Sequence, residues 1–179
     1  MTVQTDHRTI SRLPHRYDLA DDGTYPNSVL PLLVYPSAVA PAGGETAAIF
    51  ERLFTANGWP AAWRNGIYPF HHYHSTAHEV LGIGKGHAQV QAGGPSGPIL
   101  ELRPGMAVII PAGVAHRKLG AGSDLLVVGA YPRGQRWDMN DGSPGERPRT
   151  DDNIRRVPLP DADPIYGASG PLVEWWSIG

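Results

Sequence analysis

Cysteine is absent from the 179-residue chain. Its absence excludes disulfides, thiolate zinc sites, iron–sulfur clusters and cysteine nucleophiles together. An excess of one sign of charge is also missing, because 15 Lys and Arg stand against 17 Asp and Glu, a formal net charge of −2. This balance offers no basic surface for nucleic acid and no polybasic patch for a membrane. We therefore expect neither nucleic acid nor a membrane as a partner.

Long hydrophobic runs are absent as well. The longest apolar segment, residues 29–41, is short and contains Pro31 and Pro36, so it cannot span a bilayer. Residues 1–19 are polar and lack the apolar core of a signal peptide. Dinucleotide, Walker, nucleophile-elbow and zincin motifs are also missing from the sequence. We expect a soluble cytoplasmic protein with residues 1–179 as a single domain.

Glycine and proline, by contrast, are plentiful, at 22 and 18 residues, while 41% of the chain is hydrophobic. Such a composition is typical of a folded protein with many turns. One helix is expected over about 45–57, where Ile49, Phe50 and Leu53 fall on one face before an Asn57-Gly58 stop.

After Trp63 the apolar period changes to two, in short runs separated by glycine and proline. The runs cover residues 66–74, 79–84, 87–91, 99–102, 106–110, 114–119 and 125–131. Short strands at close spacing predict an antiparallel sandwich or barrel. The prolines in residues 28–40 favour an edge strand. We expect residues 1–25 to be loosely held and 136–156 to form a surface loop, while the apolar C-terminal tail packs on the barrel or on a second subunit.

Histidines are concentrated in one part of the chain: five of the eight lie between positions 71 and 87, and His116 follows a Pro-Ala-Gly turn. His72 and His74 are two residues apart, so on a strand both imidazoles project from one face. Glu79 follows after a short link. Three imidazoles and a carboxylate suit Fe, Mn, Ni, Co, Cu or Zn. Four protein ligands on an octahedral ion would leave two positions for water, substrate or dioxygen.

These residues carry a resemblance. Gly66-x5-His72-x-His74-x4-Glu79-x6-Gly86 resembles the first cupin motif, and Gly105-x5-Pro111-x-Gly113-x2-His116 resembles the second. The cupin family implies an all-β double-stranded β-helix, a jelly-roll barrel. It also implies one divalent transition metal (Fe, Mn, Ni, Zn or Co) on His72, His74, Glu79 and His116. The second motif usually ends in Asn where this chain has Gly120, a position that supplies no ligand.

A closer likeness covers nearly the whole chain, which is similar to the YjlB-like group of short bacterial cupins. It rests on residues 63–67 (WRNGI), 71–75 (HHYHS), 78–82 (HEVLG), 128–132 (VGAYP) and 156–160 (RVPLP). The implied architecture is a barrel over about 25–137 with one N-terminal helix and a C-terminal extension over about 138–179. The likeness implies a metal without fixing a reaction.

Several neighbours of the motif residues leave alternatives open. His78 adjoins Glu79 and is a candidate alternate ligand or ligand-orienting residue. Tyr68 and Phe70 share strand parity with His72, which favours core packing over their lining a pocket. By the same parity Lys118 follows His116 inward and could hold an anion, although a strand-end lysine more often faces solvent. His87 lies on a polar strand face and is a further candidate for pocket lining.

The sequence leaves two functions open. The first is a metal-dependent enzyme that acts on a small polar metabolite by dioxygenase, isomerase or lyase chemistry. The alternative is a non-catalytic cupin that binds a small ligand or carries its metal for structure. The intact ligand set favours chemistry, because purely structural sites usually close their coordination sphere. A homodimer is expected in either case.

Overall fold

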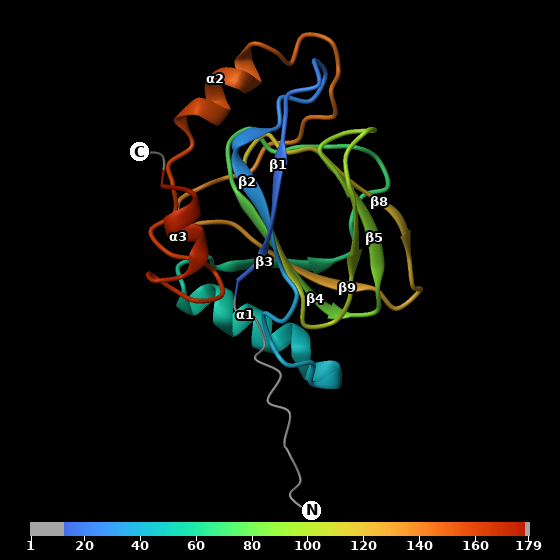
Figure 1. Ribbon diagram of the computed structural model, residues 1–179. Coiled ribbons are helices and arrows are strands. Elements are labelled where there is room, and N and C mark those ends of the chain that lie inside the picture. The colour runs from blue at the N-terminus through green and yellow to red at the C-terminus, as the bar shows by residue number, and fades with distance from the viewer. Residues whose placement is uncertain (1–12, 178–179) are drawn as a thin grey trace, which may run out of the picture.

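The computed structural model describes residues 13–177, and the strands of this part of the chain form two antiparallel β-sheets (Figure 1). Six strands form the first sheet in the order β1-β2-β7-β4-β9-β3, and three form the second in the order β6-β5-β8. The strands of the larger sheet are β1 (His15–Leu19), β2 (Ser28–Tyr35), β3 (Ala61–Asn65), β4 (Glu79–Lys85), β7 (Ala107–Ile110) and β9 (Leu126–Ala130). Those of the smaller sheet are β5 (Ala88–Ala92), β6 (Ile99–Leu102) and β8 (His116–Ala121).

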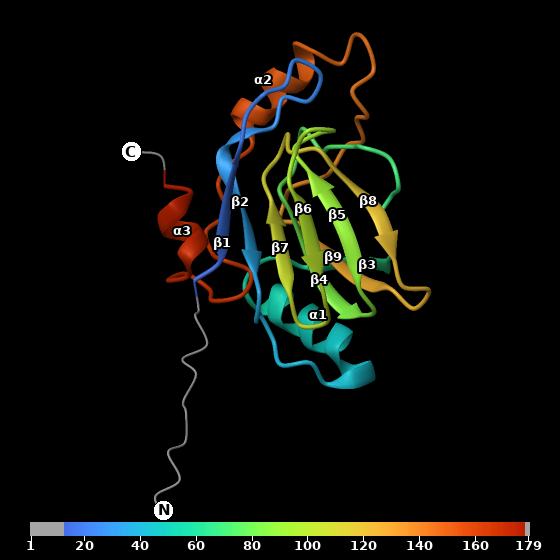
Figure 2. The ribbon, with the colours of Figure 1, turned by 45° about the vertical axis from the view of Figure 1, so that its right-hand side comes forward.

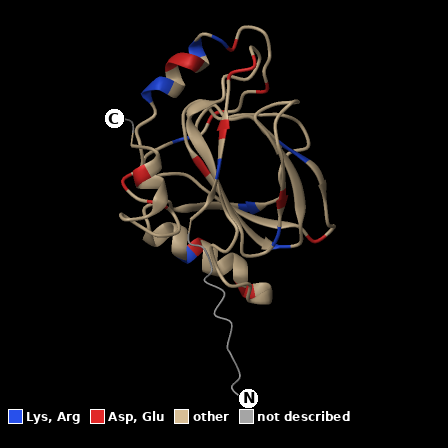
Figure 3. Ribbon diagram, in the orientation of Figure 1, with Lys and Arg blue, Asp and Glu red and all other residues tan. Residues whose placement is uncertain are grey.

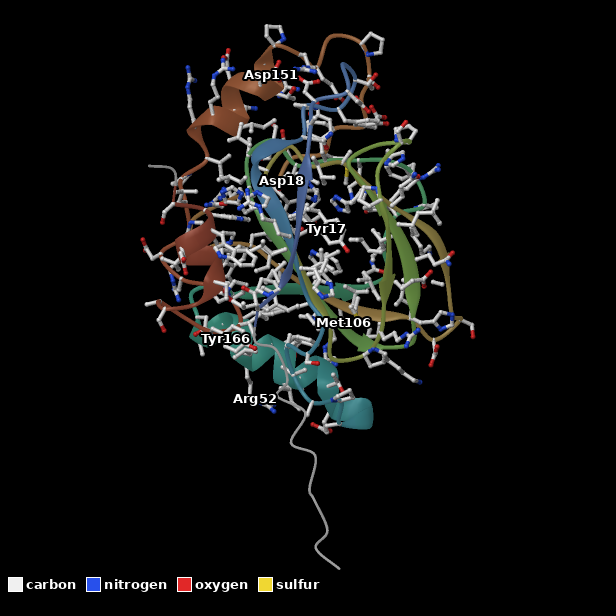
Figure 4. All side chains as sticks on the ribbon, in the orientation of Figure 1. Tyr17, Asp18, Arg52, Met106, Asp151 and Tyr166 are labelled. Atoms are coloured by element: carbon white, nitrogen blue, oxygen red, sulfur yellow. The ribbon has the colours of Figure 1, made fainter. Side chains whose placement is uncertain are left out.

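The space between the two sheets holds one of the molecule's two apolar clusters. Leu81 and Ile83 of β4 pack with Val90 and Leu102 from the facing sheet. Tyr17 and Met106, labelled in Figure 4, pack against the same cluster. Val80, which alternates with Leu81 along β4, belongs to the other cluster. Because successive side chains of a strand point to opposite faces, the residues of β4 in step with Leu81 face the barrel interior. Glu79 is one of them.

The outer face of the larger sheet carries the second apolar cluster, covered by helix α1 (Thr46–Ala56) (Figure 2). The helix buries Phe50 and Phe54 completely. It approaches β4 closely at Gly82, where a Cβ atom would lie 2.6 Å from the Cγ atom of Phe50. The helix predicted over 45–57 is therefore confirmed, and glycines on β4 make room for it.

The C-terminal extension completes this outer cluster, as predicted. It contains helices α2 (Arg149–Arg156) and α3 (Pro171–Trp175). Leu172 and Trp176 are buried in the cluster, and the Nε1 atom of Trp176 donates a hydrogen bond to the Pro31 carbonyl at 2.9 Å. The extension is thus part of the core: it packs on β2, and its Pro164 carbonyl accepts a hydrogen bond at 2.9 Å from Asn57, which follows α1.

Four sequence expectations require correction. Residues 28–35 are not an edge strand, because β2 pairs with β1 on one side and β7 on the other. The segment expected to be loose up to residue 25 contains β1, although residues 1–12 lie outside the described part. Residues 66–74 form no continuous strand and make only isolated bridges at His72 and Tyr73. The loop expected over 136–156 ends in α2, and a 3-10 helix, Gly43–Glu45, precedes α1.

Helix α2 carries charged residues of both signs, with Asp151 and Asp152 in its first turn and Arg155 and Arg156 in its last (Figure 3). This order matches the helix dipole. None of the helices formed by residues 13–177 has the length and apolar character needed to cross a membrane.

Candidate metal centre

Three buried histidines from two segments meet at one end of the barrel. His72 and His116 form a bridge in which each backbone N–H donates to the other's carbonyl, at 3.2 and 3.0 Å. His74 follows two residues later. One ring nitrogen from each of the three residues lies within 4.8 Å of the other two. The bridge therefore brings together imidazoles that are separated by more than 40 positions in the sequence, and the cluster can bind a metal ion.

Backbone carbonyls orient all three rings. The Nδ1 atom of His72 lies 3.1 Å from the Phe70 carbonyl, that of His74 lies 2.5 Å from the Asp138 carbonyl, and that of His116 lies 3.2 Å from the Val114 carbonyl. A carbonyl oxygen only accepts, so each Nδ1 carries the hydrogen. The lone pair is then on Nε2, the form that a metal ligand needs.

The Glu79 side chain faces these histidines from the start of β4. Its Oε2 atom lies 3.4 Å from the Nε2 atoms of both His74 and His116. The atom is buried and has no hydrogen-bond partner among the described residues. Its Oε1 atom accepts a hydrogen bond from the Tyr131 hydroxyl at 2.9 Å. An orphaned carboxylate oxygen beside imidazole nitrogens is a donor set that fits a divalent transition metal.

Burial and charge act in opposite directions on the ionisable groups of this cluster. Burial alone would raise the pKa of Glu79, but His74 and His116 outweigh burial and hold that pKa below its ordinary value. Burial lowers the pKa of His72 to about 3, with the neighbouring His116 acting in the same direction. Burial also opposes protonation of His74, whose pKa is nevertheless raised by the Glu79 carboxylate. The carboxylate is therefore ionised and His72 neutral, as metal ligation requires.

A cavity of about 420 Å³ opens beside the cluster, within the size range of small-molecule sites. Its walls are mainly apolar and aromatic. They include Trp63, Ile67, Tyr68, Leu81, Tyr131, Trp137 and Met139, together with Lys118. The rings of Tyr131 and Trp137 are stacked, with centroids 6.3 Å apart. Part of the segment following β9 thus forms one wall of the cavity.

Of the four residues that the sequence offered as lining for a pocket, two line this cavity and two do not. Lys118 and Tyr68 do line the cavity. Core packing was the wrong expectation for Tyr68 and Phe70, which are 51% and 46% exposed. The Phe70 ring stacks on Tyr68 and meets His72 edge to face, outside the residues that line the cavity. His87 does not line it, because it is exposed in the turn between β4 and β5.

His78 lies outside the histidine cluster. Its side chain is buried against the Trp176 ring, with centroids 4.7 Å apart. The Nδ1 atom accepts a hydrogen bond from the backbone N–H of Ala112 at 3.0 Å, while burial lowers the pKa of the ring to about 4. Strand alternation explains the difference, since adjacent residues at the start of β4 point to opposite faces. Glu79, rather than His78, faces the three histidines.

Sequence reasoning missed the groups that surround the candidate ligands. The Tyr131 hydroxyl accepts a hydrogen bond from Trp63 Nε1 at 2.9 Å while donating to Glu79. Asp138 supplies the carbonyl for His74, and its carboxylate accepts hydrogen bonds from the Ser75 backbone and hydroxyl. Tyr131 lies four residues after Val127, an interior residue of β9. This alternation could have indicated from the sequence that Tyr131 also faces the barrel interior. Asp138 carried no such signal, because its partners lie 63 and 64 residues away.

Comparison with known proteins identifies a relative of nearly the same length. No protein-family profile matches the chain. The uncharacterised protein YjlB of Bacillus subtilis (strain 168) is 41% identical over 168 residues, which cover 93% of this chain and 99% of YjlB. Among solved structures, an 11S globulin from Wrightia tinctoria, described as revealing an auxin binding site, is 20% identical with a TM-score of 0.36. The match covers 69% of this chain and 30% of the globulin chain. With its two histidine motifs at one end of a two-sheet barrel, and by its identity to YjlB over almost the full length of both chains, this protein belongs to the YjlB-like cupins.

Proposed function

We propose that the protein is a metal-dependent enzyme that acts on a small molecule. His72, His74, His116 and Glu79 would hold one divalent ion. The observation that carries the proposal is the orphaned Glu79 Oε2 atom, 3.4 Å from two imidazole Nε2 atoms beside an open cavity. Burying a carboxylate costs several kcal/mol unless a cation compensates it, and the Tyr131 hydroxyl satisfies only one of the two Glu79 oxygens. A bound divalent ion would remove that cost.

The bound ion would supply Lewis-acid or redox chemistry, which fits dioxygenase, isomerase and lyase reactions alike. The chain's own residues prepare the site for it. Tyr131 holds one oxygen of Glu79, so that the other faces the histidines. The backbone carbonyls keep the three imidazoles in one tautomer. Trp63, Tyr131 and Trp137 line the cavity beside the candidate ligands, and such apolar surface lowers the local dielectric and strengthens electrostatic interactions.

The metal site is tested by element analysis of protein purified without chelator. Wild-type protein is compared with Glu79→Gln and with His78→Gln, a matched change at the adjacent residue. We expect close to one equivalent of metal in the wild type and in His78→Gln, and a large loss in Glu79→Gln, with circular dichroism confirming that all three are folded. Loss in His78→Gln with retention in Glu79→Gln would assign the ligand to the other residue. Failure of the wild type to bind any divalent ion would overturn the proposal.

Catalysis is tested separately from metal binding. The metal-loaded protein is incubated with panels of small hydroxy acids, keto acids and phenols, and new products are followed by mass spectrometry. Conversion that disappears in Glu79→Gln supports the enzyme. Binding of a panel member to the metal-loaded protein without conversion would instead identify a non-catalytic small-ligand cupin.

A further inference from the structure

Lys118 brings a positive charge to the cavity of the metal centre. It lies two residues after His116 on β8, so both side chains project from the same face of the strand. Its backbone N–H donates to the Tyr68 carbonyl at 2.8 Å, which fixes the strand at the cavity wall. Arg117, between the two, points the other way and donates to the Gln91 side chain at 3.1 and 3.2 Å. The strand therefore presents one ligand and one cation to the same cavity.

The Lys118 ammonium has no ion-pair partner among residues 13–177. The ion pairs within this part of the chain join other residues, as in the pair of Lys85 with Asp124 at 3.8 Å on the surface. Lys118 is half-buried, and the carboxylate that shares its cavity is Glu79. One Glu79 oxygen accepts a hydrogen bond from Tyr131, and the other faces the His74 and His116 imidazoles, so neither pairs with Lys118. A half-buried cation left without a carboxylate is available to an incoming anion.

The net charge of the metal-loaded site would also favour an anionic ligand. Three neutral imidazoles add no charge, and a divalent ion outweighs the single negative charge of Glu79. Lys118 adds a further positive charge to the same cavity. Low-dielectric walls strengthen the attraction of such a site for an anion.

The walls of the cavity define the rest of the ligand. Trp63, Trp137 and Met139 offer flat or flexible apolar surface, which suits a body without charge. We infer that the substrate is a small organic carboxylate with an apolar or aromatic body, and that Lys118 and the metal bind its carboxylate. The inference rests on the proposed metal site and specifies what that site accepts.

The test uses the full chain loaded with Co²⁺, whose visible spectrum reports on the ligands of the ion, and benzoate as the probe. Benzoate is titrated into the wild type, Lys118→Met and Lys85→Met, with benzamide as the uncharged analogue. Tryptophan fluorescence provides a second readout of binding in the cavity. We expect benzoate to perturb the Co²⁺ spectrum and the fluorescence. We expect Lys118→Met to weaken benzoate binding about tenfold or more. Lys85→Met should bind benzoate as tightly as the wild type, and both variants should keep the wild-type affinity for Co²⁺.

The outcomes separate the two proposals. Equal benzoate affinity in the wild type and Lys118→Met would overturn the role of Lys118, even though metal binding is intact. Benzamide binding as tightly as benzoate would overturn the carboxylate preference. Absence of Co²⁺ binding in the wild type would overturn the metal site itself, and the substrate inference with it.

Discussion

At the residue scale, one hydroxyl group orients the Glu79 carboxylate. Tyr131 donates to Oε1 and accepts from Trp63 Nε1, both at 2.9 Å, so its ring and its hydroxyl are fixed from two sides. The hydrogen bond leaves Oε2 as the oxygen that faces the histidines. Groups of this kind, which hold a ligand without contacting the ion, tune metal affinity.

Replacing Tyr131 with Phe is therefore expected to weaken metal binding by about tenfold, within the range found for partners of metal ligands. The ring is retained, so the barrel should fold normally. Competition against a chromogenic chelator measures the affinity. Tyr166→Phe is the matched control, because Tyr166 packs on Tyr35 in the outer cluster. Equal affinities in both variants would show that Glu79 needs no orienting donor.

The candidate ligand residues could be selected from the sequence, whereas the contacts that Asp138 makes with them could not. His72, His74 and Glu79 lie within eight positions, and His116 has its own motif, so local spacing carried the information. The carbonyl of Asp138 reaches His74 across 64 positions through an irregular segment. No periodic pattern encodes such a contact, because it depends on where the segment after β9 folds back.

At the element scale, the contact between β4 and α1 fixes one wall of the barrel. Gly82 and Gly84 lie on the outer face of β4, beneath Phe50 and Ala47. The same strand carries Glu79 and Leu81 toward the cavity. A displacement of α1 would therefore also shift β4, the strand that positions the candidate ligand Glu79.

Gly82→Ala is expected to destabilise the protein by about 1–3 kcal/mol, since its new Cβ atom would overlap the Phe50 ring in a packed core. Urea unfolding followed by circular dichroism measures the free energy of unfolding. Gly44→Ala is the matched control, because a Cβ atom there meets nothing within 4 Å. A loss of stability in Gly44→Ala as large as that in Gly82→Ala would contradict the steric explanation.

Elements with a strong period were predictable, and those held by pairing alone were not. The apolar stripe of α1 and the alternation of β4 identified both elements. The strand β1 is short, largely exposed and polar in sequence, and its pairing with β2 stabilises it. Pro31 suggested an edge strand, yet β7 pairs only with residues 33–35, beyond the proline. The missing N–H of the proline therefore costs no hydrogen bond to β7.

At the scale of the whole molecule, the C-terminal extension connects the barrel to the outer cluster. Asp163 is fully buried and accepts hydrogen bonds from the backbone of Ile165, Tyr166 and Leu172 and from the Tyr35 hydroxyl. These contacts join the extension to β2. The sequence indicated a tail that packs back on the barrel but could not show how it is held. The homodimer and the cytoplasmic location stay predictions.

Removal of one indole tests how far the whole fold depends on this extension. Trp176 is 1% exposed, packs on the His78 ring and donates to the Pro31 carbonyl of β2. Trp176→Ala is expected to cost about 3–5 kcal/mol, because it opens a cavity and leaves a β2 carbonyl without its donor. Trp175→Ala, the matched change at a partly buried neighbour, should cost less.

Thermal and urea unfolding of both variants measures the difference. Trp176 packs on His78, the residue before Glu79. A loss confined to the extension would appear as a separate early transition, with the barrel unfolding later as in the wild type. We expect a single cooperative transition shifted to lower temperature, because the outer cluster combines side chains of β2, β4, β9 and the extension in one packed unit. Two transitions would show that the barrel is stable without its extension, and metal content measured between them would show whether the histidine site survives alone.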